Sequence, residues 1–217
     1  MKNKIFMSLL LGAMLLTACD DEAPMERSLY PETVYLVGAK DKIITRELNL
    51  GYDQDTVYAS VAVSGTLPTE KNVIAEVEQI PEAILRYNDR ELGTNDVLYQ
   101  NLPADIYSIP DPAVTVPAGE PYGTLPIYIE PATLHVDSLY MIALKLKSTS
   151  DFALTKTDTV VLMKFNIVND YSGLYYMDAI IKDVANPSDS VTYKTSRNLQ
   201  AVRDGRTCLL YTSPSPR

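Results

Sequence analysis

Hydrophobic and polar residues alternate with a period of two along much of this chain. In residues 55–65, Val57, Ala59 and Val61 fall on one side of an extended segment and Tyr58 on the other. Segments with this pattern, or with a short apolar run between turn residues, are 33–38, 42–50, 55–65, 72–79, 113–119, 123–131, 138–148 and 159–168. Such segments, bounded by Gly, Pro and Asp, are typical of half-buried antiparallel strands. About eight of them predict an all-β fold, an immunoglobulin-like antiparallel β-sandwich over residues 32–168.

One segment departs from this alternation. Residues 80–92 place Pro81 and Glu82 where a helix would begin, followed by Ala83, Ile84 and Tyr87. Pro and an acidic residue are favoured in the first helical turn. We therefore expect a short helical turn that bridges the two sheets.

A second β-rich domain begins after the sandwich. Residues 169–173 resemble a linker, and residues 174–184 and 190–202 predict two further strands. The last ten residues, 208–217, resemble the translation of a sequencing-library adapter, and the alternative is a natural Ser/Pro-rich tail. We expect the second domain, 169–207, to be truncated and Cys208 to be foreign to the protein.

The N-terminus has the order of an export signal. Lys2 and Lys4 precede an apolar run that is too short to span a bilayer, which needs about 20 residues. The sequence then reads Leu-Thr-Ala-Cys and resembles the lipobox of bacterial lipoproteins, in which the cysteine is lipidated and becomes the new N-terminus. We predict a signal peptide over residues 1–18 and lipid attachment at Cys19. The alternative is an ordinary secretory signal with a chance cysteine.

Acidic residues follow that cysteine directly. Asp20, Asp21 and Glu22 open a tether, 19–31, that is solvated and flexible by composition. In lipoproteins of Bacteroidota, such residues resemble the signal for export to the outer face of the outer membrane. We therefore expect a lipid-anchored protein exposed at the cell surface.

The net charge of the chain limits the kinds of partner that it is expected to bind. The whole chain carries −9, and removing residues 1–18 and 208–217 takes away three basic residues and no acidic ones, which leaves −12. Such a surface disfavours nucleic acid and an electrostatic hold on anionic lipid. The expected link to the membrane is the lipid on Cys19.

A family resemblance is carried by residues 85–146. Its marks are Tyr87-Asn88, Tyr99, Leu102-Pro103, Tyr107, Val116, Ala118-Gly119 and Tyr140, in that order. They resemble an N-terminal domain of unknown function found in surface lipoproteins of Bacteroidota, often encoded in starch-utilisation-system-like glycan loci. Residues from Tyr171 onward resemble the start of a C-terminal domain that commonly follows it. The resemblance implies display beside glycan-capture machinery and transfers no catalytic residue.

The sequence shows no motif for enzyme chemistry. His135 stands alone and precedes a strand, and without a second histidine or a native thiol no zinc ligand set is present in the sequence. Nucleophile motifs, phosphate loops and dinucleotide fingerprints are also absent from the sequence. We predict no catalytic residue, no metal and no cofactor, and expect that the protein is not an enzyme.

Tyrosine is the residue type that could bind glycans. Sugar rings present apolar faces that pack on aromatic rings. The candidates for stacking are Tyr122, Tyr128, Tyr175 and Tyr176. The more common role of tyrosine in a sandwich is structural, and the absence of Trp favours that interpretation.

Four Asp-(Ser/Thr)-apolar stretches resemble O-glycosylation sites of Bacteroidota secreted proteins. Their hydroxyl residues are Thr56, Ser138, Thr159 and Ser190. The alternative is that Asp with Ser or Thr often precedes a strand, because both favour turns.

These observations favour a non-catalytic spacer or interaction module of a surface glycan-capture system. Its expected partners are polysaccharide or outer-membrane glycan-uptake proteins, with carbohydrate bound through a downstream domain. Two alternatives remain, an adhesin or pilus-type subunit and the non-catalytic N-terminal part of a glycoside hydrolase.

Overall fold

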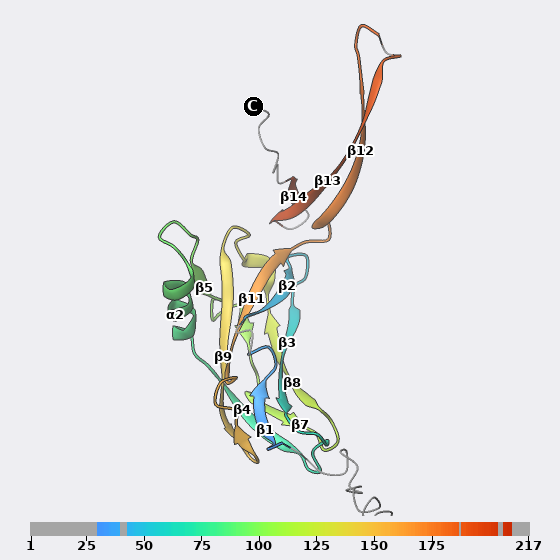
Figure 1. The fold of residues 1–217 in the computed structure, drawn as a ribbon. Helices are drawn as coiled ribbons and strands as arrows, with labels where there is room; N and C mark the ends of the chain where they lie inside the picture. The colour runs from blue at the N-terminus through green and yellow to red at the C-terminus, as the bar shows by residue number, and fades with distance from the viewer. Residues whose placement is uncertain (1–29, 40–42, 187, 204–205, 210–217) are drawn as a thin grey trace, which may run out of the picture.

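The computed structural model describes residues 30–39, 43–186, 188–203 and 206–209, and it confirms the predicted β-sandwich. Two sheets pack against each other, and a long β-hairpin projects beyond them (Figure 1). The first sheet has five strands in the order β10-β1-β3-β8-β6. Its strands are β1 (Thr33–Leu36), β3 (Asp55–Val63), β6 (Tyr107–Ser108), β8 (Tyr122–Ile129) and β10 (Ala153–Leu154).

The second sheet has six strands. Five follow the order β2-β11-β9-β4-β7, and β5 pairs with β9 off this path. Its strands are β2 (Ile43–Asn49), β4 (Val73–Gln79), β5 (Tyr99–Asn101), β7 (Ala113–Val116), β9 (Leu139–Thr149) and β11 (Val160–Val168). Both sheets are mixed, because β1 with β10, β2 with β11 and β5 with β9 pair in parallel while the other pairs are antiparallel.

The core lies between the two sheets and follows the predicted alternation. Leu125 and Ile127 of β8 and Ile142 and Leu144 of β9 are each at most 1 % exposed and belong to one cluster. The opposite face of β9 is also covered, since Met141 is fully buried. A strand buried on both faces therefore forms the middle of the six-stranded sheet.

The predicted helical turn is a ten-residue helix, α2 (Glu82–Glu91). Our expectation that it bridges the two sheets is wrong, because it joins β4 to β5 and both belong to the six-stranded sheet. Ile84 of α2 packs with Met141 and Leu162 in a second cluster on the outer face of that sheet. A 3-10 turn, η1 (Pro131–Thr133), follows β8.

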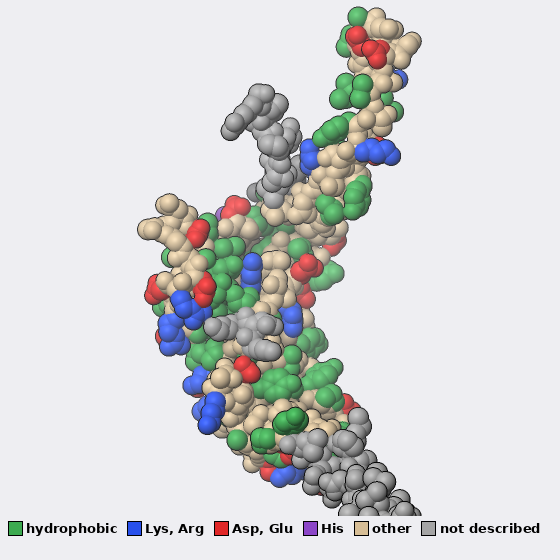
Figure 2. Space-filling view, viewed as in Figure 1, with side chains coloured by type: hydrophobic (Ala, Val, Ile, Leu, Met, Phe, Trp, Pro, Cys, Tyr) green, Lys and Arg blue, Asp and Glu red, His purple; other side chains and the backbone are tan. Residues whose placement is uncertain are grey.

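The hairpin contains both strands predicted after the sandwich. β12 (Gly173–Lys182) pairs antiparallel with β13 (Ser190–Arg203), and β13 pairs with β14 (Arg206–Leu209). At its base, Ala201 is 8 % exposed and joins the core cluster of the sandwich. Beyond the base the hairpin stands clear of the sheets, and hydrophobic side chains lie on its surface (Figure 2).

Candidate functional site

The structure places Tyr122 and Tyr128 on the solvent side of the five-stranded sheet. Both belong to β8, whose alternate residues Leu125 and Ile127 point into the core. Tyr122 is 53 % exposed and Tyr128 is half-buried. Since strand residues of equal parity share a face, the two tyrosines lie on one side, about 20 Å apart at 3.4 Å per residue.

Two further tyrosines lie on this side. Tyr58 of β3, 50 % exposed, stands beside Pro126, and Tyr35 of β1 stands beside Ala62. Sequence reasoning gave Tyr58 the outward side of its strand but did not group it with Tyr122. The pairing registers of β1 with β3 and of β3 with β8 bring these side chains onto one face. We call Tyr35, Tyr58, Tyr122 and Tyr128 the tyrosine face.

The centre of the tyrosine face is apolar and lies below the level of the surrounding rings. Ala62 lies between Tyr35 and Tyr122 in the register, and it is only 5 % exposed although it is on the outer side. A small residue flanked by two tyrosines on adjacent strands, about 4.8 Å away on each side, forms a shallow floor between the rings.

The tyrosine face carries hydroxyl groups rather than charges. The other outward residues of β3 and β8 are Thr56, Ser60, Ala62, Thr124 and Pro126. At the rim, the Arg46 guanidinium donates from Nη2 to the main-chain oxygen of Tyr58 at 3.5 Å. A flat aromatic surface with hydroxyl groups and no charged side chain among these strand positions is suited to an uncharged ligand with apolar faces.

Tyr175 and Tyr176 do not form a comparable pair. They are neighbours in β12, so their side chains point to opposite faces of the hairpin. Tyr175 is 41 % exposed beside Arg197, whereas Tyr176 is 84 % exposed beside Ser196. One ligand surface cannot use both rings.

The family marks have structural roles. The Asn88 side chain, 5 % exposed, donates from Nδ2 to the main-chain oxygen of Tyr99 at 2.7 Å and accepts from its N–H at 3.1 Å. The rings of Tyr87 and Tyr99 meet edge to face with centroids 5.8 Å apart. These contacts fasten α2 to β5. Similarly, Gly119 has φ of +82° in the turn after β7, a conformation that favours glycine.

The four candidate glycosylation residues all lie where strands begin. Thr56 is the second residue of β3 and Ser190 the first of β13, while Ser138 and Thr159 directly precede β9 and β11. Ser190 is exposed and the other three are half-buried. At Thr56 the Asp55 carboxylate accepts the Thr56 N–H at 2.8 Å, a local bond of the kind that favours turns.

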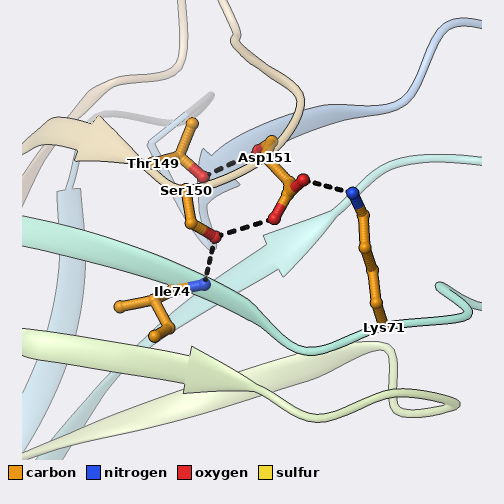
Figure 3. A network of polar contacts seen from close by, with 5 residues as sticks. All are labelled: Lys71, Ile74, Thr149, Ser150 and Asp151. Carbon is orange, nitrogen blue, oxygen red and sulfur yellow. Dashed lines mark hydrogen bonds and ion pairs between the residues drawn. The ribbon is translucent and has the colours of Figure 1, made fainter.

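A polar network fastens the turn that leads from β9 to β10, where the chain crosses from one sheet to the other (Figure 3). The Ser150 hydroxyl accepts the Ile74 N–H at 3.0 Å and donates to Asp151 at 3.0 Å. The Lys71 ammonium pairs with the same carboxylate. Hydrogen bonds from Lys71 and then Ser150 lower the pKa of Asp151 below its ordinary value of 3.8. We assign this network to structure, because each of its groups is already paired.

The remaining candidates from the sequence either lie outside the described residues or make few contacts. Cys19, Asp20, Asp21 and Glu22 lie outside the described residues. His135 is exposed, and its main-chain N–H donates to the Tyr140 hydroxyl at 3.3 Å.

Two general searches covered only the described part of the chain. Within it, no group of three or more His, Cys, Asp or Glu side chains is arranged to hold a metal ion. Within the same residues, no helix has the length and hydropathy to cross a membrane.

Two family models match the chain in sequence. One describes an N-terminal domain and covers residues 30–153, and the other describes a C-terminal domain and covers residues 159–214. A search of curated protein sequences found no match.

Solved structures from Bacteroides share the fold. A protein of unknown function from Bacteroides ovatus matches with a TM-score of 0.60 at 16 % identity, over 85 % of this chain and 63 % of its own. A candidate carbohydrate binding protein from Bacteroides ovatus matches with a TM-score of 0.50 at 14 % identity, over 71 % and 43 %. An auxiliary nutrient binding protein from Bacteroides thetaiotaomicron matches with a TM-score of 0.51 at 16 % identity, over 76 % and 59 %. The chain thus spans less than two thirds of the length of these relatives.

Proposed function

Because the chain belongs to a family of Bacteroides proteins that join this N-terminal domain of unknown function to a following C-terminal domain, we propose that it captures neutral glycans at the cell surface without catalysis. The sandwich acts as an interaction module, held at the outer membrane by a lipid on Cys19. Two structural relatives bear names that concern carbohydrate or nutrient binding, which supports a glycan-related role.

The observation that carries this proposal is the tyrosine face. Tyr58 and Tyr122 expose about half of their surface on a sheet face whose other strand positions are small, hydroxylated or apolar. Water-exposed aromatic rings bury apolar surface when a sugar ring stacks on them. Because the rings lie on a regular sheet, they are already positioned before a ligand arrives, which reduces the entropy lost on binding.

The shape of the face favours an extended chain over a single sugar. The rings spread over three neighbouring strands and about 20 Å of strand length, so a polysaccharide could contact several of them at once. Several weak contacts with one polymer raise the overall avidity, so no single deep pocket is needed. The outward positions of β3 and β8 carry no charged side chain, which favours neutral over acidic polysaccharides.

The test is native gel electrophoresis through gels that contain one neutral polysaccharide each: amylopectin, yeast mannan or xyloglucan. We expect at least one to retard the protein. Tyr58→Ala and Tyr122→Ala should each weaken the retardation roughly three- to tenfold, the effect of losing one aromatic contact.

The matched control is Tyr52→Ala. Tyr52 is 52 % exposed, close to the 53 % of Tyr122, but lies in the turn between β2 and β3 and outside the tyrosine face. Thermal unfolding should be unchanged in all three variants. Retardation that survives both Tyr58→Ala and Tyr122→Ala would show that another surface binds, and retardation by no neutral polysaccharide would refute glycan capture by this chain.

A further inference from the structure

A cleft lies where the hairpin leaves the sandwich. It has a volume of about 560 Å³, between the end of β11, the adjoining part of β2 and the base of β13. This volume is typical of small-molecule sites, which often form where two structural units meet. The polar residues that line it are Glu47, Asn49, Ser138, Asn166, Asn169, Ser172, Asn198 and Gln200.

The amide groups of the cleft differ in how much hydrogen-bonding capacity they have left. Asn49 is committed, since its Nδ2 donates to Asp170 at 2.8 Å and its Oδ1 accepts the Gly51 N–H at 2.9 Å. Asn166, Asn198 and Gln200 are exposed, and no side-chain hydrogen bond joins them to another described residue. An amide offers two donors and one acceptor, and a sugar hydroxyl offers one donor and accepts as well, so the two are complementary.

The charge of the residues that line the cleft restricts the charge of the ligand that it can bind. Among the described residues that line the cleft, Glu47 is the charged one, and neither Lys nor Arg is present. An acidic sugar would meet a carboxylate of the same sign without a cation to offset it. An uncharged polyol would not.

The cleft also has an apolar part and a firm base. Val136, Leu139 and Ile167 are half-buried along its wall and can contact the C–H face of a sugar ring. Asn169, 5 % exposed, holds the connection into β12, because its Oδ1 accepts the Tyr171 N–H and the Ser172 hydroxyl, both at 3.1 Å. Ala201 anchors the other strand in the sandwich core.

We infer that this cleft binds the end of a neutral oligosaccharide, an inference that rests on the proposed function and adds a second site to it. The tyrosine face is flat and contacts the middle of a long chain. The cleft is concave and carries uncommitted amides at Asn166, Asn198 and Gln200, so it contacts the hydroxyl groups of a chain end.

The test is isothermal titration calorimetry of the purified chain with maltohexaose, cellohexaose and α-1,6-linked mannohexaose. Each probe is a short neutral oligosaccharide, so its binding does not depend on the avidity of a long polymer. We expect one of them to bind. Asn166→Ala, on the sandwich side, and Gln200→Ala, on the hairpin side, should each weaken that binding roughly tenfold, as expected when a directed hydrogen bond is lost.

The matched control is Gln100→Ala, which removes an exposed amide on β5 outside the cleft and should bind as the unaltered chain does. All three residues are exposed, so thermal unfolding should not change. Equal binding by Asn166→Ala and Gln200→Ala would overturn the cleft site. Failure of every hexaose to bind would overturn it too, and if a neutral polysaccharide still retards the protein in gels, the proposed function would stand without it.

Discussion

The sandwich and the hairpin have the same strand pattern but opposite burial. In β8, Leu125, Ile127 and Ile129 alternate with outward residues and are at most 1 % exposed. In β12 and β13, Ile181 and Val191 alternate in the same way, yet they are 64 % and 63 % exposed. The alternation therefore determines which residues share a face, and a separate element determines whether that face is covered.

One face of the hairpin is apolar along most of its length. Pairing puts Tyr175, Met177, Ala179, Ile181, Val191 and Tyr193 together on that face. The opposite face carries more polar groups, including the Asp178–Lys194 pair at 3.4 Å. Of the hairpin residues described, Ala201 is the one that reaches the buried core. The hairpin thus has the amphipathic pattern of a half-buried sheet without the second layer that a stable sheet needs.

Matched Ile→Ala substitutions give the largest expected contrast. Ile142→Ala in β9 removes a side chain with no exposed surface and should lower the free energy of unfolding by about 2–5 kcal/mol. Ile181→Ala in β12 should change it by no more than about 0.5 kcal/mol, since that side chain is largely exposed. Urea unfolding followed by tyrosine fluorescence measures both. A cost at Ile181 close to that at Ile142 would mean that the apolar face of the hairpin is covered in solution.

Matched asparagines extend the contrast to polar groups. Asn88→Ala leaves the N–H and carbonyl of Tyr99 without their partner beneath α2, so we expect a loss of about 1–3 kcal/mol in the free energy of unfolding. Asn198→Ala, at an exposed position on the hairpin, should be close to neutral in the absence of a ligand. Hydrogen exchange adds a local measurement, because the Tyr99 amide should lose protection in Asn88→Ala and keep it in Asn198→Ala. Unchanged protection at Tyr99 would show that α2 is held by its apolar contacts alone.

The sequence predicted the sandwich well where one face of a strand is buried. All eight predicted strands are present, because alternation of apolar and polar residues reports directly on half-burial. The sandwich strands that were missed, β5, β6 and β10, have two or three residues each and are too short for periodicity to show. Their positions depend on contacts with β9, β8 and β1, which are distant in sequence.

The tyrosine face could be predicted only in part, because the sequence pattern specifies relations within a strand but not between strands. Parity within one strand places Tyr122 and Tyr128 on one side and separates Tyr175 from Tyr176, so both relations could be obtained from the sequence. The partnership of Tyr122 with Tyr35 and Tyr58 depends on the register between strands, which local pattern does not specify. The cleft at the base of the hairpin depends on how β11 leads into β12, so no local motif marks it.

The smallest expected effect comes from one ion pair in each region. Lys71–Asp151 belongs to the network of Figure 3, with the Asp151 side chain 30 % exposed, whereas Asp178 in the hairpin pair is 66 % exposed. Because the folded-state pKa of Asp151 is lowered, its carboxylate stabilises the fold above the ordinary pKa of 3.8, and this contribution is lost as the pH falls through the folded pKa. Asp151→Asn should therefore lower the urea midpoint near pH 7, and its difference from the unaltered chain should shrink below about pH 4.

Asp178→Asn is the control for this pair. An exposed ion pair contributes little to stability, so the urea midpoint of this variant should match that of the unaltered chain at both pH values. A midpoint difference for Asp151→Asn that persists at low pH would show that the substitution acts through packing or the turn, and not through the carboxylate charge. An equal pH-dependent difference for Asp178→Asn would mean that the hairpin is held as firmly as the crossing turn, and the contrast between the two regions would then fail for polar as well as apolar groups.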